Sequence, residues 1–157
     1  MALQVEDYFA IQACLHSYPF LLDKGDFAGL GELFKLAKIY SGGELMADRD
    51  PEKVTATFRD WLYTYHDGSP RTRHCICNVI IQPESDTRAL VKSYVMVFQQ
   101  TPDLPLQPII GGDYRDTMEK IDGEWRFVER HIGNDLVGNL SAHGRDTGVI
   151  RPMRANG

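Results

Sequence analysis

A histidine and an aspartate stand out as residues that could remove a proton from carbon. His74 lies in the run RTRHCICNVII, whose alternation predicts a strand on which His74 shares one face with Ile76, Asn78 and Ile80. If that face is internal and a carboxylate holds the imidazole, His74 is a natural general base near neutral pH. Asp23 is the candidate carboxylate. The alternative is a strand histidine that is merely satisfied by a neighbour.

Tyr18 and Arg130 are the candidates for contacting a substrate beside this pair. Tyr18 lies on the first predicted helix, and a phenol in a cavity can hydrogen-bond a carbonyl or a developing enolate. Arg130 alternates with Val128 and Ile132, which places its guanidinium on an otherwise apolar face, where it can steady a leaving group or an anion. Tyr18 could instead be a core tyrosine, and Arg130 could pair with a structural acid such as Asp135.

Motifs for other chemistries are missing from the sequence. The remaining histidines occur without HExxH, His-x-His or a cluster of carboxylates, so we expect no metal site. The glycine pairs at 42–43 and 111–112 form no GxGxxG or phosphate-binding loop, and no Gly-x-Ser-x-Gly elbow occurs. Cys14, Cys75 and Cys77 have neither redox nor zinc spacing and are predicted to be reduced, buried thiols. We therefore expect no cofactor.

Composition narrows the class of protein and of partner. The 157 residues suit one domain, with 43% hydrophobic and 25% charged residues, as is ordinary for a globular protein. A net charge of -5 and scattered basic residues argue against a nucleic-acid partner. No apolar run is long enough to span a membrane, and the start MALQVEDYFAIQ lacks the pattern of a secretory signal. We expect a cytoplasmic protein.

Three helices are predicted in the first half of the chain. Apolar spacing predicts the first over residues 5–22, with Pro19 bending or loosening its last turn. Asp26 can cap a second helix in FAGLGELFKLA, beyond which the double glycine at 42–43 marks a break. The sequence Asp-Pro-Glu at 50–52 is a strong start signal for a third helix, EKVTATFRDWLYTYH.

After Pro70 the apolar period changes to two. The predicted strands are RTRHCICNVII, TRALVKSYVMVFQQ, IIGGDYRDTMEKI and EWRFVERHI, with a tight turn at residues 122–123 and a proline-rich connection, QTPDLPLQP. Helices followed by strands indicate an α+β fold with an antiparallel sheet. A strongly curved sheet covered by three helices forms a cone with a cavity at its open end. We expect one domain over residues 1–143 and an irregular tail over residues 144–157.

Three stretches of the chain, in this order, resemble the SnoaL-like branch of the NTF2-like superfamily. They are AIQACLHSYPFLLDKGDFAGLGELF, RTRHCICNVII and GGDYRDTMEKIDGEWRFVERHI, and the closing DLVGNLSAH agrees with the same pattern. The resemblance extends from about Asp7 to His143 and implies the NTF2-like cone. Fold alone does not fix the reaction, because this superfamily contains cyclases, isomerases, dehydratases and binding modules.

Within the superfamily, the chain is most similar in motif to scytalone dehydratase and hexachlorocyclohexane dehydrochlorinase. Both use a His-Asp dyad to remove a proton without a cofactor. The resemblance implies that Asp23 and His74 form the dyad, and that Tyr18 and Arg130 occupy the polar positions beside it. Scytalone dehydratase also uses a second histidine from a later strand, and SYVMVFQQ has none at that place. Dehydration of that particular substrate is therefore not expected.

These observations together predict a cofactor-independent lyase or isomerase acting on a small, mostly apolar, ring-containing molecule, with His74 as base and Asp23 orienting it. One alternative is a non-catalytic ligand-binding module, in which Asp23 and His74 form a structural pair. Another is a dioxygenase β-subunit, which shares the cone but serves an iron-carrying partner. We expect a homodimer or homotrimer, since the outer face of such a sheet is apolar.

Overall fold

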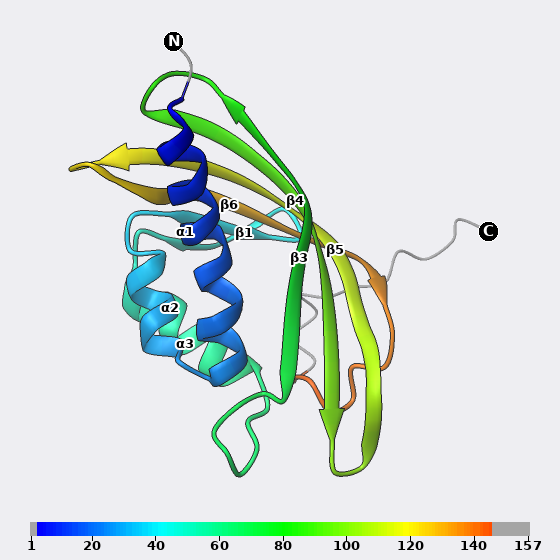
Figure 1. The fold of residues 1–157 in the computed structure, drawn as a ribbon. Helices are drawn as coiled ribbons and strands as arrows, with labels where there is room; N and C mark the ends of the chain where they lie inside the picture. The colour runs from blue at the N-terminus through cyan, green and yellow to red at the C-terminus, as the bar shows by residue number, and fades with distance from the viewer. Residues whose placement is uncertain (1–2, 146–157) are drawn as a thin grey trace.

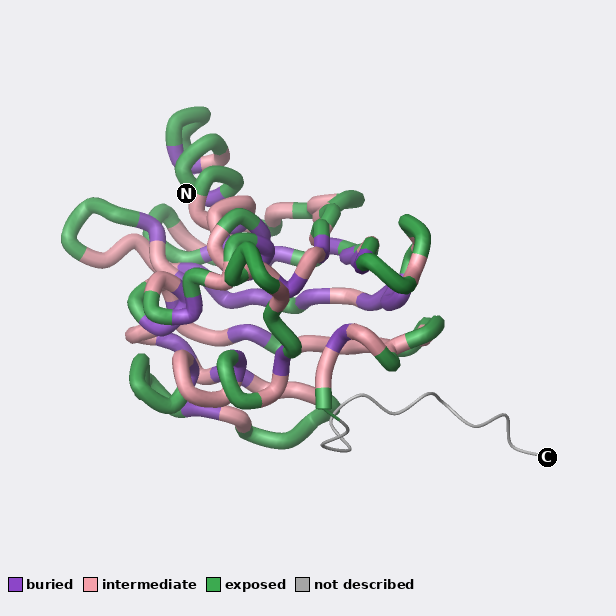
Figure 2. Tube along the Cα trace, turned by 90° about the horizontal axis from the view of Figure 1, so that it is seen from below, coloured by how far each residue is buried: buried purple, intermediate pink, exposed green. Residues whose placement is uncertain are grey.

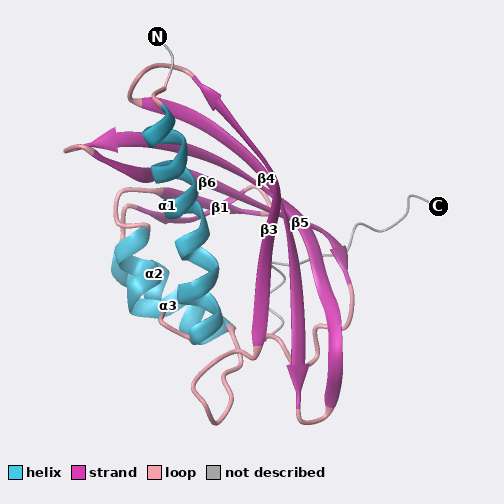
Figure 3. Cartoon of the chain, in the orientation of Figure 1, coloured by secondary structure: helices cyan, strands magenta, loops and turns pink. Residues whose placement is uncertain are grey.

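A computed structural model describes residues 3–145, in which three helices pack on a single six-stranded sheet. The helices are α1 (Val5–Lys24), α2 (Phe27–Leu33) and α3 (Pro51–Trp61). The strands are β1 (Lys38–Ser41), β2 (Glu44–Asp48), β3 (Thr72–Pro83), β4 (Arg88–Thr101), β5 (Leu104–Ile121) and β6 (Glu124–Val137). The helices lie together on the concave side of a strongly curved sheet (Figures 1 and 3). The predicted α+β cone is confirmed.

Side-chain caps start α2 and α3, as the sequence predicts. Asp26 and Asp50 each accept a hydrogen bond of 2.8 Å from the backbone N–H three residues later. Both helices are shorter than predicted, because α2 ends at Leu33 and α3 ends at Trp61. Beyond α3 the chain is extended, since Leu62 pairs with a segment near the end of the described chain. This tertiary pairing overrides the local helical signal.

The first helix carries two of the candidate site residues, Tyr18 and Asp23. α1 continues through Pro19 to Lys24, so the helix includes its predicted weak point. It ends at Gly25, whose φ of 75° is left-handed and suits a residue without a side chain. Asp23 is therefore held in the last turn of a regular helix.

The four predicted strands, β3 to β6, pair antiparallel as expected, and the unpredicted strand β1 makes the sheet mixed. Its strand order is β2-β1-β6-β5-β4-β3, and β1 pairs with β6 in parallel. The β1–β2 hairpin was not predicted, because its two glycines were interpreted as a break. Gly42 and Gly43 have φ values of 58° and 86°, as a tight hairpin turn requires. The other strand pairs are antiparallel.

The segment predicted as a proline-rich connection is mostly strand. β4 extends to Thr101 and β5 begins at Leu104, which leaves only a two-residue turn between them. Pro108 lies where the pairing register of β4 and β5 shifts, a position at which a missing backbone N–H is tolerated. The hairpin predicted at Asp122 and Gly123 is present, and both residues have positive φ.

The core lies between the helices and the concave face of the sheet. Figure 2 shows the buried positions mostly in the middle of the molecule and the exposed positions mostly at its periphery. Fully buried members come from both layers, among them Ile11, Leu15, Leu30, Phe34 and Phe127. Of the predicted tail, Gly144 and Arg145 are bonded to the end of α3, and the rest lies outside the described residues. No helix among residues 3–145 is long and apolar enough to cross a membrane.

Candidate active site

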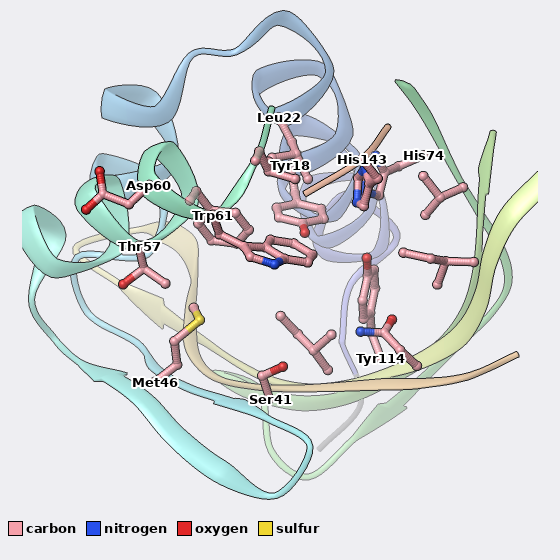
Figure 4. A pocket seen from close by; sticks show the side chains of 16 residues that line it. Tyr18, Leu22, Ser41, Met46, Thr57, Asp60, Trp61, His74, Tyr114 and His143 are labelled. Carbon is pink, nitrogen blue, oxygen red and sulfur yellow. The ribbon is translucent and has the colours of Figure 1, made fainter. Parts of the chain in front are cut away.

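A cavity of about 300 Å³ opens between the ends of α1 and α3 and the concave face of the sheet. Its wall is mostly apolar, with Leu22, Trp61, Val97, Ile110 and Ile132 among its side chains. The polar groups that reach it include two histidines and two tyrosines (Figure 4). An apolar cavity with a few convergent polar groups is typical of a small-molecule site.

Asp23 and His74 form a hydrogen-bonded pair at the wall of this cavity. Oδ1 of Asp23 lies 2.6 Å from Nδ1 of His74, and the backbone N–H of His74 donates to Oδ2 at 2.8 Å. The hydroxyl of Thr72 donates to Oδ1 at 2.7 Å. The side chains of Asp23 and His74 are 9% and 6% exposed, respectively. The structure therefore brings the two predicted residues together, with His74 lining the cavity and Asp23 behind it.

The hydrogen bonds on Asp23 keep its carboxylate ionised. Burial alone would raise its pKa, but the ring and backbone of His74 and the hydroxyl of Thr72 outweigh that effect, so the pKa lies below its usual value. A carboxylate at Nδ1 favours the tautomer that carries its proton there. The other ring nitrogen, Nε2, is then left with a free lone pair.

A β-bulge lets β3 direct two different stretches of side chains inward. Thr72, His74 and Ile76 face the helices, and the pairing with β4 then shifts by one residue beyond Cys77. Asn78 at the bulge has a φ of 54°, which asparagine tolerates better than most residues. Ile80 is consequently 63% exposed. The prediction that Asn78 and Ile80 share the face of His74 was wrong, because a bulge reverses the alternation.

Tyr18 lines the cavity next to His74, as predicted, and Tyr114 from β5 lies beside it. The ring centroids of Tyr18 and His74 are 6.0 Å apart, and those of Tyr18 and Tyr114 are 5.8 Å apart, both in edge-on contacts. Burial raises the pKa of both phenols above the usual value. They therefore remain protonated donors near neutral pH, suited to a carbonyl or enolate oxygen. Tyr114 was one of several tyrosines that the sequence did not distinguish.

Arg130 is buried behind the tyrosines and does not line the cavity. Its guanidinium makes two hydrogen bonds, of 2.7 and 2.8 Å, to the carboxylate of Asp116, and both side chains are completely buried. The guanidinium carbon lies 4.6 Å from the Tyr18 ring centre and 4.3 Å from that of Tyr114. The prediction that Arg130 contacts a substrate directly is therefore wrong, and Arg130 instead supports the two tyrosines. Its acid is Asp116 and not Asp135, since the strand register places Asp116 opposite it.

Val128 is the extra residue in β6 and does not share the face of Arg130. The β5–β6 register shifts between Thr117 and Met118, which pair with Glu129 and Phe127. The sequence could not show this shift, because alternation alone assigned Val128 to the face of Arg130.

His143 is a second histidine of the cavity that the sequence analysis considered only as a metal ligand. Its side chain is almost fully buried and lines the cavity near His74. Burial, together with the charge of His74, lowers its pKa to about 4, against a smaller opposing effect of Asp23. The resemblance to scytalone dehydratase would place a second histidine on β4, where SYVMVFQQ has none. The closing sequence DLVGNLSAH instead supplies one from beyond the last strand.

The cysteines and the remaining histidines form no site of their own in residues 3–145. Cys75 and Cys77 are exposed on the outer side of β3, and Cys14 is half-buried, so the prediction that all three are buried was wrong. The two strand cysteines point outward because they alternate with inward-facing His74 and Ile76. No group of three His, Cys, Asp or Glu side chains in this range could hold a metal ion.

Comparisons with known proteins agree with this architecture. A family model described as a SnoaL-like domain matches residues 3–131. One similar solved structure is a protein of unknown function with a cystatin-like fold from Nostoc punctiforme. It is 23% identical with a TM-score of 0.71, and the match covers 86% of this chain and 96% of that chain. A search of curated proteins found no match.

Two further similar structures come from Novosphingobium aromaticivorans. A "Putative Scytalone Dehydratase" is 24% identical with a TM-score of 0.70, and 96% of each chain is covered. An NTF2-like protein with a cystatin-like fold is 20% identical with a TM-score of 0.69, covering 88% of this chain and 87% of that chain. At such identities the structures establish only the fold, and the match to the family model establishes the family. The family match covers residues 3–131, most of the chain, so the chain belongs to the SnoaL-like family, and its fold is that of the NTF2-like structure.

Proposed function

We propose that the protein is a cofactor-independent lyase or isomerase that removes a proton from carbon in a small, mostly apolar, cyclic substrate. The observation that carries this proposal is the 2.6 Å contact between Asp23 and Nδ1 of His74, at the wall of an apolar cavity. His74 is the base, and Asp23 holds its ring and its tautomer. A structural pair sealed from the cavity would not support this proposal, whereas His74 lines it.

The first step is a proton transfer to His74. Nε2 takes a proton from a carbon next to a carbonyl group, the C–H bond breaks, and its electron pair moves to the carbonyl oxygen as an enolate. Asp23 stabilises the imidazolium that forms. The phenols of Tyr18 and Tyr114 donate hydrogen bonds to the negative oxygen, and Arg130 supports both rings from behind. A conjugated enolate then takes the proton back from His74 at another carbon, which gives isomerisation. An enolate with a leaving group on the neighbouring carbon instead expels it, and the leaving group takes the proton from His74, which gives elimination.

The cavity favours a ring-containing substrate. Its volume of about 300 Å³ accommodates a molecule of one or two fused rings, and its wall is mostly apolar or aromatic. The similar structure from Novosphingobium aromaticivorans carries the name of a dehydratase, which agrees with an elimination. No lysine or arginine of residues 3–145 lines the cavity, so its wall does not demand an anionic substrate, and Arg130 behind the tyrosines is paired with Asp116.

Exchange of hydrogen for deuterium tests the proton transfer without knowledge of the natural substrate. 1-Tetralone in deuterated buffer should exchange the hydrogens next to its carbonyl faster with the protein than without it. His74→Ala should reduce the catalysed rate by about 100-fold to 10,000-fold, the contribution of a positioned base. His66→Ala, at an exposed loop histidine, is the matched control and should retain the rate. Equal rates for wild type and His74→Ala would reject the assignment and favour a binding module.

Association into a homodimer or homotrimer is part of the same proposal. Tyr94 and Met96 on β4 are 60% and 36% exposed on the outer face of the sheet, beside exposed Cys75 and Cys77. An apolar patch of this kind is typical of a contact between subunits. Light scattering of the purified protein should show an oligomer, and Tyr94→Lys should shift it toward the monomer. A monomeric wild type, or co-purification with a larger metalloprotein, would instead favour the β-subunit alternative.

A further inference from the structure

His143 is a buried polar side chain that the proposed proton transfer does not use. It is 2% exposed, lines the same cavity as His74, and its Nδ1 has no hydrogen-bond partner among the described residues. Figure 4 shows the two imidazoles at the same wall of the cavity. That nitrogen is shielded from the cavity as well as from solvent, so the part of the ring that a ligand in the cavity can meet is the opposite edge, which carries Nε2.

The backbone around His143 is held firmly on both sides. We call residues 140–145 the strap, because they cross from the sheet to the end of α3. The Ala142 carbonyl accepts hydrogen bonds from the Tyr65 hydroxyl (2.7 Å) and from Gln99 Nε2 (2.9 Å), and the His143 carbonyl accepts one from the Tyr63 N–H (3.0 Å). At the end of the strap, the Arg145 N–H donates to the Trp61 carbonyl (2.9 Å), and Trp61 Nε1 donates to the Arg145 carbonyl (2.8 Å). A side chain on such a support is pre-positioned for binding.

The imidazole of His143 is fixed and electrically neutral. Trp61 meets it edge-on, with ring centroids 5.3 Å apart at 85°. Burial, with repulsion from His74 when that ring is protonated, lowers its pKa to about 4, so it carries no charge at neutral pH. A neutral imidazole donates a hydrogen bond from one nitrogen and accepts at the other. A second positive charge would oppose formation of the His74 imidazolium, so neutrality of His143 suits a base at His74.

We propose that His143 is a second catalytic histidine, which in its neutral form hydrogen-bonds an oxygen of the substrate while His74 removes the proton. The inference rests on the proposed function and adds a substrate contact to it. His143 itself neither gains nor loses a proton in the step. A substrate with a carbonyl or hydroxyl group can make this hydrogen bond and a hydrocarbon cannot, so the strap selects for substrates that carry oxygen.

This contact lies beyond the residues that the family model matches. The family match ends at residue 131, whereas the strap begins at residue 140. The dyad and the tyrosines belong to the matched part, and His143 reaches the same cavity from beyond it. The strap therefore adds a polar side chain to a cavity whose base and tyrosines lie within the family match.

Equilibrium binding of 1-tetralone and tetralin tests this contact separately from turnover. The two molecules share their rings and differ by one carbonyl oxygen in place of a methylene group. In the wild type and in His143→Phe, calorimetry gives the ratio of ketone to hydrocarbon affinity. The ratio should fall about threefold to tenfold in His143→Phe, as expected for one neutral hydrogen bond. His143→Gln should retain part of the preference, and the control His66→Phe all of it.

An unchanged ratio in folded His143→Phe would overturn the proposal. If that variant does not fold, nitrogen-15 spectra of the wild type decide, with the His143 resonances assigned by their loss in His143→Gln. Tetralone should shift these resonances and tetralin should not, and equal responses would also overturn the proposal. Failure of the exchange experiment on His74→Ala would reject the base and leave the affinity ratio interpretable, because binding requires no proton transfer.

Discussion

The guanidinium of Arg130 lies 4.6 Å from the centre of the Tyr18 ring, and of these two residues only Tyr18 lines the cavity. A cation that lies over the face of an aromatic ring is attracted to the ring, and the attraction is stronger when both groups are buried away from water. Phe34 and Phe127 complete the enclosure, at 5.3 and 4.7 Å from the same guanidinium. Arg130 thus positions a residue of the cavity without contacting its contents.

Removing the partner of this buried charge should destabilise the protein strongly. Asp116→Asn leaves Arg130 charged and unpaired in the core, and breaking such a pair costs about 3–5 kcal/mol of unfolding free energy. Urea denaturation measures this loss. The double variant Asp116→Leu, Arg130→Met removes both charges and should lose less than Asp116→Asn alone. A double variant that is no more stable than the single one would contradict the ion-pair explanation.

Neutralising the orienting acid should reduce catalysis while the base stays in place. Asp23→Asn can no longer stabilise an imidazolium, so deuterium exchange of 1-tetralone should fall about 100-fold to 10,000-fold. Thr72→Val removes only the hydroxyl that donates to Asp23, and its loss should be about tenfold or less. Full exchange activity in Asp23→Asn would argue that His74 acts without its partner.

The buried neutral state of His143 should make stability depend on pH. Its pKa is about 4 when folded and 6.5 in the unfolded chain, so the unfolded chain binds a proton first as the pH falls below 6.5. This contribution is fully present above pH 6.5 and is lost progressively toward pH 4. Between pH 7.5 and pH 5 it amounts to about 2 kcal/mol.

Urea titrations of wild type and His143→Phe at these two pH values isolate that contribution. The wild type should lose about 2 kcal/mol more than the variant on acidification, since all other titrating groups are shared. Identical losses in the two proteins would show that His143 titrates normally in the folded state.

The three cysteines should differ in reactivity. Cys75 and Cys77 are exposed, whereas burial raises the pKa of the Cys14 thiol to about 11. Because the thiolate is the reactive form, a disulfide reagent at pH 8 should label two thiols of the Tyr94→Lys variant quickly and the third only after unfolding, since this variant leaves the proposed subunit contact uncovered. Cys14→Ala should leave the fast reaction unchanged. Three fast thiols would mean that α1 opens readily from the core.

Local chemistry made much of the fold predictable. Asp50 followed by proline predicted the start of α3, and the turn at residues 122–123 was visible from Asp-Gly alone. The pair of Asp23 and His74 was also predictable, but through resemblance, because no spacing rule relates residues 51 positions apart. Their geometry depends on Gly25 ending the helix where Asp23 can reach β3.

Long-range pairing decided what the sequence could not show. The short strand β1 exists because β6 lies beside it, and α3 ends where the strap pairs with Leu62. The partner of Arg130 depends on a register shift in the β5–β6 pair, which alternation does not reveal. His143 reaches the cavity only because Gln99 and Tyr65 fix the strap from two sides. Each of these contacts joins segments far apart in the chain.

The carboxylate of Asp23 binds both the ring and the main chain of His74, and through them it joins the last turn of α1 to the first residues of β3. A local opening at this junction would separate acid from base while the rest of the core stayed intact. Loss of catalysis on heating should therefore precede the calorimetric melting transition, so that activity reports the local opening of the contact between α1 and β3.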